Sequence, residues 1–182
     1  MTAECCKVET KKTDANKYSL RKPEFYNKWR KFFQYLVTHI GYMIRFKLVY
    51  RLEVLGKENI PEHSEYILAA NHLSTLDPPL VCGIINKGVA YMAKKELFDN
   101  LFLRWWLDWL GAFAVDREKL GISTIKTVMS IKQTGWVLGI FPQGKTCYKE
   151  KEPFKDIKGG FAAVAKMAKM DIVPIAICGF TG

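Results

Sequence analysis

Short apolar runs recur from residue 66 onward, and polar turns containing Gly, Pro or Asn separate them. Runs of this length between turn residues are typical of buried strands. The sequence predicts five: Tyr66–Ala70, Val89–Met92, Gly111–Val115, Trp136–Phe141 and Ile172–Cys178. A sixth strand is predicted over Tyr50–Val54, where apolar and polar residues alternate.

Between these runs, apolar residues return at intervals of three and four, the spacing of one helix face. Helices are predicted from Leu80 onward, over Glu96–Leu110, from Ile122 to about Gly135, and over Gly160–Met170. Strands that alternate with helices indicate an α/β fold. We expect a mixed, mostly parallel sheet flanked by helices, forming one domain over residues 50–182.

The N-terminal part has a different pattern. Residues 1–22 are polar, Lys-rich and aperiodic, which predicts a disordered polar tail. Residues 23–49 place apolar and mainly aromatic side chains at helical spacing among Lys and Arg, with Gly41 as a position where the helix could divide. Such basic amphipathic helices usually lie in the membrane interface, so we expect a helical membrane-association segment. The alternative is a helix packed on the domain core.

The excess of positive charge in residues 1–60 favours an anionic partner for the N-terminal part of the chain. The formal net charge is +10, and residues 1–60 hold 13 Lys or Arg against 6 Asp or Glu. A membrane surface, a nucleic acid or a phosphorylated substrate would each satisfy that excess. Because the basic residues lie on an apolar helix and no nucleic-acid motif is present, we expect a membrane phospholipid surface and no nucleic acid.

Cysteine usage bears on the compartment. The five cysteines show neither a C-x-x-C pair nor metal-ligand spacing, and Cys82 and Cys178 lie in apolar runs where burial is expected. The polar first 22 residues do not resemble a signal peptide. These features predict no metal and a reduced, cytosolic setting.

The most informative stretch is Asn71-His72-Leu73-Ser74-Thr75-Leu76-Asp77-Pro78-Pro79, between a predicted strand and a predicted helix. Residues five apart point about 140° away from each other in a helix and to opposite faces in a strand. His72 and Asp77 therefore meet only if the chain turns between them. Either Ser74 caps the helix with Asp77 three residues on, or Asp77 is the cap and Pro78 opens the first turn. Both allow Asp77 to orient His72 as a general base.

This stretch resembles the first motif, N-H-x-x-x-x-D, of the glycerolipid acyltransferases. Three further stretches resemble the family's later motifs in the usual order, and Lys158-Gly159-Gly160 resembles its K-x-G segment. They are Gly111-Ala112-Phe113-Ala114-Val115-Asp116-Arg117 with one residue inserted, Phe141-Pro142-Gln143-Gly144, and Val173-Pro174-Ile175-Ala176. The resemblance covers the chain from about Leu52 onward.

The third motif departs from the family's F-P-E-G-T-R, since Gln143 replaces Glu, Lys145 replaces Thr and Thr146 replaces Arg. The resemblance implies that Arg117 and the loop residues Phe141, Gln143, Gly144, Lys145 and Thr146 bind the acceptor's phosphate. Lys145 could supply the missing charge one position early. Lys binds phosphate as a point charge rather than as a bidentate fork, so the departure bears mainly on which acceptor is used.

A second motif overlaps the same loop. Gly139 to Thr146 matches the nucleotide-binding P-loop, G-x-x-x-x-G-K-[ST]. That motif needs a helix beginning at Lys145, whereas the residues that follow have no apolar period and include Pro153. We therefore expect no P-loop.

The resemblance implies an acyltransferase with His72 and Asp77 as catalytic residues. It would move a fatty acyl group from acyl-CoA or acyl carrier protein to a lysophospholipid, most simply 1-acylglycerol-3-phosphate, giving phosphatidate. No cofactor beyond the acyl donor is implied, and the expected location is the cytoplasmic face of a membrane. Two alternatives stay open: another lysolipid or alcohol as acceptor, and a catalytically weak membrane-binding module of the same fold.

Overall fold

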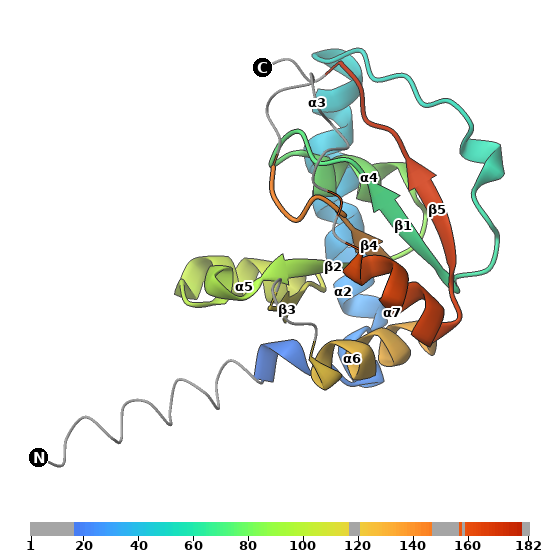
Figure 1. Ribbon diagram of the computed structural model, residues 1–182. Coiled ribbons are helices and arrows are strands. Elements are labelled where there is room, and N and C mark those ends of the chain that lie inside the picture. Colours follow the sequence, from blue (N-terminus) through green and yellow to red (C-terminus); the bar gives the residue numbers. More distant parts are fainter. Residues whose placement is uncertain (1–16, 117–120, 147–156, 158, 180–182) are drawn as a thin grey trace, which may run out of the picture.

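In a computed structural model, which describes residues 17–116, 121–146, 157 and 159–179, five strands form one sheet in the order β3-β2-β4-β1-β5 (Figure 1). The strands are β1 (Tyr66–Ala70), β2 (Val89–Lys94), β3 (Phe113–Val115), β4 (Val137–Ile140) and β5 (Asp171–Ile175). All four pairings are parallel. The antiparallel part of the expected mixed sheet is therefore not found in the described residues, and the predicted α/β class is confirmed.

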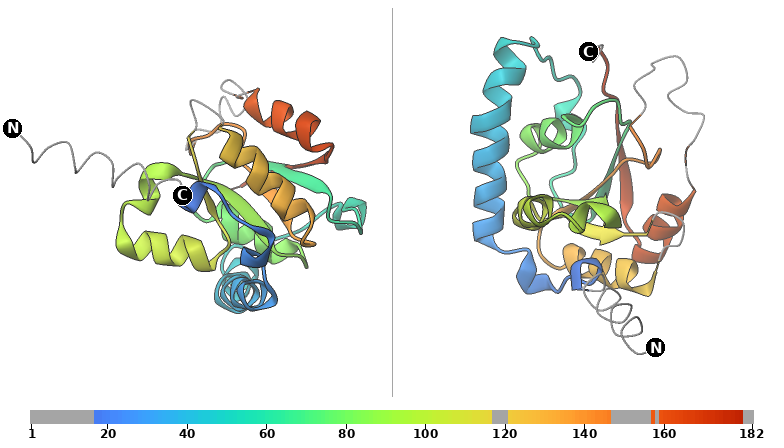
Figure 2. Two further views of the ribbon diagram at one scale, coloured as in Figure 1. Left: turned by 90° about the horizontal axis from the view of Figure 1, so that it is seen from below. Right: turned by 90° about the vertical axis from the view of Figure 1, so that its left-hand side faces the viewer.

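Helices cover both faces of the sheet (Figure 2). On one face lie α6 (Ile122–Lys132) and α7 (Gly160–Ala168), and on the other lies α4 (Asp77–Ile84) with the N-terminal helices. Strand residues alternate between two cores: in β1, Ile67 packs with the α6 and α7 side, while Tyr66 and Leu68 pack with the α4 side. Burial on both faces explains why these strands are continuous apolar runs in the sequence.

The N-terminal helices form one long rod along the side of the molecule (Figure 2, right). It consists of α2 (Lys28–Tyr35), the π-helical stretch η2 (Leu36–Tyr42) and α3 (Met43–Leu48). The helix does not divide at Gly41; the π-helical turns carry it past that residue. No helix within the described ranges is long and apolar enough to cross a membrane.

The inner side of the rod combines polar residues with Phe46 of α3, and its outer side carries an apolar stripe. Gln34 and Thr38 are buried, and Gln34 pairs with the sheet: Val89 N donates to its Oε1 at 2.9 Å, and its Nε2 donates to the Val89 and Leu110 carbonyls. The exposed stripe is apolar and recurs at steps of three and four: Trp29, Phe32, Leu36, Ile40, Ile44 and Leu48. An exposed apolar stripe of this length is unusual for a surface in water.

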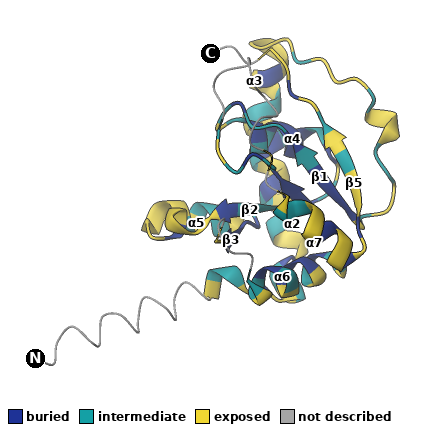
Figure 3. Cartoon of the chain, viewed as in Figure 1, coloured by how far each residue is buried: buried dark blue, intermediate teal, exposed yellow. Residues whose placement is uncertain are grey.

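Helix α5 (Leu101–Trp109) projects beside β2 and β3, preceded by the short 3-10 helix η4 (Lys95–Phe98). Figure 3 shows it mainly as exposed, and none of its residues is buried. Asp108 ties it to the body through ion pairs with Arg21 and Arg30, the latter at 3.2 Å. Phe33 of α2 adds ring contacts with Trp106 and Trp109.

Four predictions are corrected by these elements. Tyr50–Val54 is not a strand: Arg51 has a φ of 49°, outside the extended region, and the segment only packs Leu52 and the Tyr50 ring against the core cluster that contains Phe46. The predicted helix over Glu96–Leu110 is two helices, because the Asn100 side chain caps α5 by accepting from Phe102 N and Leu103 N. Cys178 is exposed, unlike the buried Cys82.

The fourth concerns the N-terminal tail. Residues 1–16 lie outside the described residues, but the packed chain begins before residue 23. Arg21 is 7% exposed, its backbone N–H donates to Thr127 on α6, and its guanidinium meets Asp108.

Candidate active site

The candidate site lies where β1 and β4, neighbours in the sheet, end side by side. His72 comes two residues after β1, and Phe141 comes directly after β4. In open parallel sheets, ligands bind at this carboxyl edge, where loops rather than strands carry the side chains. The topology thus brings the first and third sequence motifs together although about 70 residues separate them.

His72 and Asp77 make the contact that their spacing suggested. His72 Nδ1 lies 2.8 Å from Asp77 Oδ2, with the Asp77 side chain fully buried and the His72 side chain 15% exposed. The backbone N–H groups of Leu73 and Ser74 donate to the same Oδ2 at 2.6 and 2.7 Å. Three donors on one oxygen fix the carboxylate, and a carboxylate on Nδ1 leaves Nε2 as the basic nitrogen.

The turn that creates this contact differs from both predicted registers. Asp77 is the first residue of α4, and the N-cap is Leu76, without a side-chain cap. The Ser74 hydroxyl instead accepts from Leu76 N at 3.2 Å, within the turn. The Asp77 carboxylate reaches backward over the loop, which is how it meets His72.

Two amide side chains hold the backbone around His72. Asn71 forms a two-way clamp with Ile177: its Nδ2 donates to the Ile177 carbonyl at 2.8 Å, and Ile177 N donates to its Oδ1 at 2.7 Å. From the β4 loop, Gln143 Oε1 accepts the His72 N–H at 2.6 Å. The histidine is thus fixed at its ring and on both sides of its backbone.

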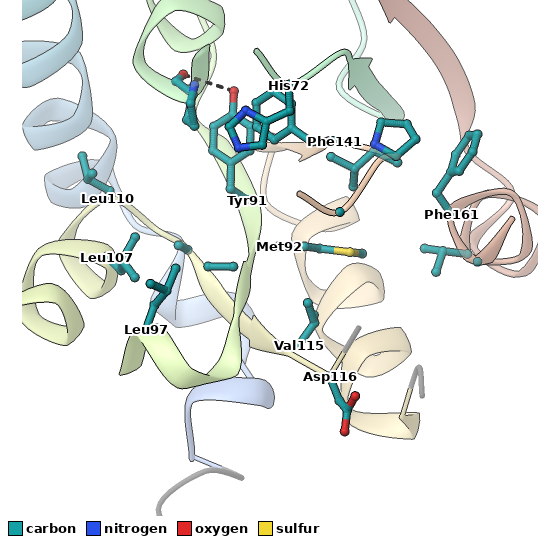
Figure 4. A pocket seen from close by; sticks show the side chains of 18 residues that line it. His72, Tyr91, Met92, Leu97, Leu107, Leu110, Val115, Asp116, Phe141 and Phe161 are labelled. Carbon is teal, nitrogen blue, oxygen red and sulfur yellow. Dashed lines mark hydrogen bonds between the residues drawn. The ribbon is translucent and has the colours of Figure 1, made fainter. Parts of the chain in front are cut away.

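A pocket opens beside the His72 ring (Figure 4). Its volume is about 260 Å³, and it extends from His72 along the edge of the sheet, with lining residues from both α5 and α7. The lining is largely apolar and includes Met92, Leu97, Leu107, Leu110, Val115 and Phe161. An apolar cavity with one basic group at its mouth suits a substrate with a hydrocarbon tail and a reactive polar end.

The other predicted site residues are spread over this edge. Phe141 and Gly144 line the pocket, whereas Gln143 is 3% exposed and faces the His72 backbone. Lys145 is exposed and Thr146 is half-buried. Arg117 lies outside the described residues, directly after Asp116, which lines the pocket.

The same loop does not form a P-loop. Gly139 lies inside β4, and Lys145 and Thr146 are not helical. The buried Gln143 side chain, at the centre of the motif, is used to hold His72. Within the described ranges, no group of three His, Cys, Asp or Glu side chains could hold a metal ion.

Sequence reasoning missed Tyr91 of β2, which lies beneath Phe141 and lines the pocket. Burial, together with the neighbouring Cys82 thiol, raises the pKa of Tyr91 well above its usual value, and burial raises the pKa of Cys82 to about 12. Both groups therefore stay protonated near neutrality. The sequence did contain one signal for Tyr91, namely Gly139 inside the predicted strand, because a glycine in a strand often marks the close approach of a neighbouring group.

Comparisons with known proteins identify the family to which the chain is similar. The sequence model of a family described as "Acyltransferase" matches residues 51–178. The 1-acyl-sn-glycerol-3-phosphate acyltransferase of Bacillus subtilis is 40% identical over 129 residues, which are 70% of this chain and 63% of that protein. The enzyme of the same name from Streptococcus pneumoniae is 38% identical over 125 residues, 67% of this chain and 45% of that protein. The chain thus spans about half to two thirds of these curated relatives.

A solved structure shares the fold. The crystal structure of the 1-acyl-sn-glycerophosphate (LPA) acyltransferase PlsC from Thermotoga maritima matches with a TM-score of 0.60. The match has 21% identity and covers 84% of this chain and 60% of that one.

Proposed function

This chain belongs to the acyltransferase family, and we propose that it acylates the free hydroxyl of a lysophospholipid, with 1-acylglycerol-3-phosphate as acceptor and phosphatidate as product. The observation that carries the proposal is the His72–Asp77 pair at the mouth of an apolar pocket. The acyl donor is a thioester, acyl-CoA or acyl carrier protein.

Each member of the pair has its own role in the proposed reaction. His72 Nε2 takes the proton of the acceptor hydroxyl as its oxygen attacks the thioester carbonyl. The new C–O bond forms, the C–S bond breaks, and the proton passes from Nε2 to the leaving thiolate. Asp77 holds Nδ1–H and stabilises the imidazolium without itself taking a proton. This route needs no acyl-enzyme.

The remaining parts of the site would bind the two ends of the substrates. The apolar pocket beside His72 suits an acyl chain. Lys145, exposed on the β4 loop, and Arg117, which follows the pocket residue Asp116, supply positive charge for the acceptor's phosphate. A lysine one position before the place of the family's arginine keeps a positive charge in the loop and changes the geometry of recognition.

We also propose that the α2–α3 rod lies on the cytoplasmic face of a membrane. Its apolar stripe is exposed although the rod also buries Gln34, Thr38 and Phe46 against the domain, and such an exposed stripe is typical of an interfacial helix. Lys28, Lys31, Arg45 and Lys47 are exposed on the same rod and favour anionic lipid headgroups.

The activity is tested by a product assay with labelled acyl-CoA or acyl carrier protein and a panel of lysolipids. Wild-type protein should form phosphatidate, and His72→Ala should lower the rate by about 10²–10⁴-fold. His63→Ala, at an exposed histidine, is the matched control and should be unaffected. Transfer to a different acceptor would redirect the proposal to that lipid. Near-wild-type turnover by folded His72→Ala would refute the mechanism.

Membrane docking is tested separately with vesicles containing phosphatidylglycerol. Binding should weaken as salt rises, and Phe32→Glu with Ile40→Glu should release the protein from the vesicles. Both residues are exposed, so the fold should be retained. Ile122→Glu, at a residue on α6 that is 76% exposed, is the control. Equal loss from the control would show that added charge alone is responsible.

A further inference from the structure

Three aromatic rings stack in a column that ends on His72. The His72 and Phe141 ring centroids lie 4.2 Å apart with an interplanar angle of 22°, and Phe141 and Tyr91 lie 5.5 Å apart at 10°. We propose that Tyr91 is a positioning residue for the reaction: it sets the plane of His72 through Phe141 while holding the helix that carries Asp77. Figure 4 shows the three rings together at the pocket mouth.

Tyr91 reaches the other half of the pair through its hydroxyl. The Tyr91 O–H donates to the Pro78 carbonyl at 3.2 Å, and Pro78 follows Asp77 in the first turn of α4 (dashed line, Figure 4). One side chain on β2 therefore contacts α4, which carries Asp77, directly, and reaches His72 through Phe141. The raised pKa of Tyr91 keeps this hydroxyl protonated as a donor at neutral pH.

The neighbouring strand is built to admit the Tyr91 ring. Gly139 pairs with Tyr91 in the β2–β4 register, and a Cβ there would lie 2.4 Å from Tyr91 Cε1 and 2.8 Å from Val89 Cγ1. Any larger residue would push the ring out of the column. The glycine that gave the loop its P-loop appearance is thus explained by the Tyr91 ring lying across it.

The column restrains a rotation that Asp77 alone leaves available. A single hydrogen bond to Nδ1 fixes one point of the imidazole, while the ring can still tilt about that contact. A flat aromatic face against the imidazole restricts the tilt, since ring pairs prefer defined stacked geometries. Misorientation of a reacting group lowers turnover rather than binding.

The kinetic test, which rests on the proposed function, uses a double-mutant cycle. Tyr91→Leu should lower kcat about tenfold or more with the KM for lysophosphatidate within about twofold, and Tyr91→Phe should retain at least a third of kcat because the ring remains. Phe141→Leu should resemble Tyr91→Leu, and the double variant should be no worse than the poorer single variant, because both act through one column. Full additivity, a loss confined to KM, or Tyr91→Phe as poor as Tyr91→Leu would overturn the inference.

The matched control is Tyr26→Leu. Tyr26 is 4% exposed, packs on Trp136 in the core on the α6 side, and is outside the site. This variant should lose thermal stability while keeping kcat. If Tyr91→Leu does not fold, Phe141→Leu and Gly139→Ala displace the column without removing Tyr91, and both should lower kcat. Unchanged kcat in either would contradict the proposal.

A second readout needs no turnover. The chain has three histidines, so ¹⁵N ring signals can be assigned to His72 by their loss in His72→Ala. Tyr91→Leu should shift or broaden these signals, whereas Tyr91→Phe and Tyr26→Leu should leave them in place. Unchanged His72 signals in Tyr91→Leu would refute the positioning role. If the wild-type protein acylates no lysolipid while Tyr91→Leu still shows the expected changes in the His72 signals, only the proposed function is refuted.

Discussion

The loop after β1 and the loop after β4 begin side by side at one edge of the sheet, yet they hold their side chains very differently. In the first, Asp77 is fully buried with three donors on one oxygen, and Asn71 clamps Ile177 in the segment that follows β5. In the second, Gln143 turns inward to support His72, while Lys145 is exposed.

Under the proposed function, the difference between the two loops separates chemistry from recognition. A base must be held in one orientation before the substrate arrives, so its surroundings are over-determined. A point charge for a phosphate needs only proximity. The first loop should therefore respond to substitution through turnover and stability, and the second through acceptor affinity.

The largest expected effect is that of Asp77→Asn. The amide oxygen can still accept hydrogen bonds from Leu73 N and Ser74 N, but the negative charge that stabilises the imidazolium is lost. The NH₂ group takes the place of Oδ1, an atom that has no hydrogen-bond partner within the described residues. We expect kcat to fall by about 10²–10⁴-fold, measured by steady-state kinetics with circular dichroism as the check on folding. A fall of less than threefold would mean that the carboxylate is only a structural ligand of the loop.

A smaller effect is expected at Asn71. Asn71→Ala removes both hydrogen bonds with Ile177 and leaves the N–H and carbonyl of Ile177 without these partners. The free energy of unfolding should therefore fall by about 1–3 kcal/mol. Urea denaturation measures this loss. Asn86→Ala, at an exposed asparagine, should change it by less than about 0.5 kcal/mol. Equal stability of the two variants would show that the clamp contributes nothing.

The smallest effect should come from Lys145. Lys145→Ala should raise the KM for lysophosphatidate severalfold with kcat nearly unchanged, because an exposed charge contributes little beyond attraction to the phosphate. Lys145→Arg should retain affinity, and Lys126→Ala, at an exposed lysine of α6, is the control. A larger loss in kcat than in KM would place Lys145 with the chemistry and erase the contrast between the loops.

Local patterns predicted most of the fold and the central pair. Tyr66–Ala70 was predicted with its observed bounds, because a strand buried on both faces reads as a continuous apolar run. The His72–Asp77 contact followed from the impossibility of its spacing in a regular element. The strand at Tyr50–Val54 failed because alternation records only which residues face inward, and a strand also needs a partner.

What the sequence could not reveal depended on contacts between distant segments. The spacing of Trp29, Phe32 and Leu36 identifies a helix face but does not say whether that face turns toward the domain or away from it. The orientation of the helix is known from the hydrogen bonds of Gln34, which donates to the carbonyls of Val89 on β2 and of Leu110 after α5. Tyr91 was overlooked for the same reason, since its significance comes from Phe141, 50 residues away.

The attachment of α5 makes the pocket adjustable from a distance. Leu107 and Leu110 form part of its wall. The helix that carries Leu107 is held by the ion pairs of Asp108 with Arg21 and Arg30 and by the ring contacts with Phe33, and none of its residues is buried. Substitutions at these two arginines, which do not line the pocket, would therefore shift α5 and change the width of the cavity. If the pocket holds the acyl chain as proposed, substitution of Arg21 or Arg30 would alter chain-length preference while His72 and Asp77 stay unchanged.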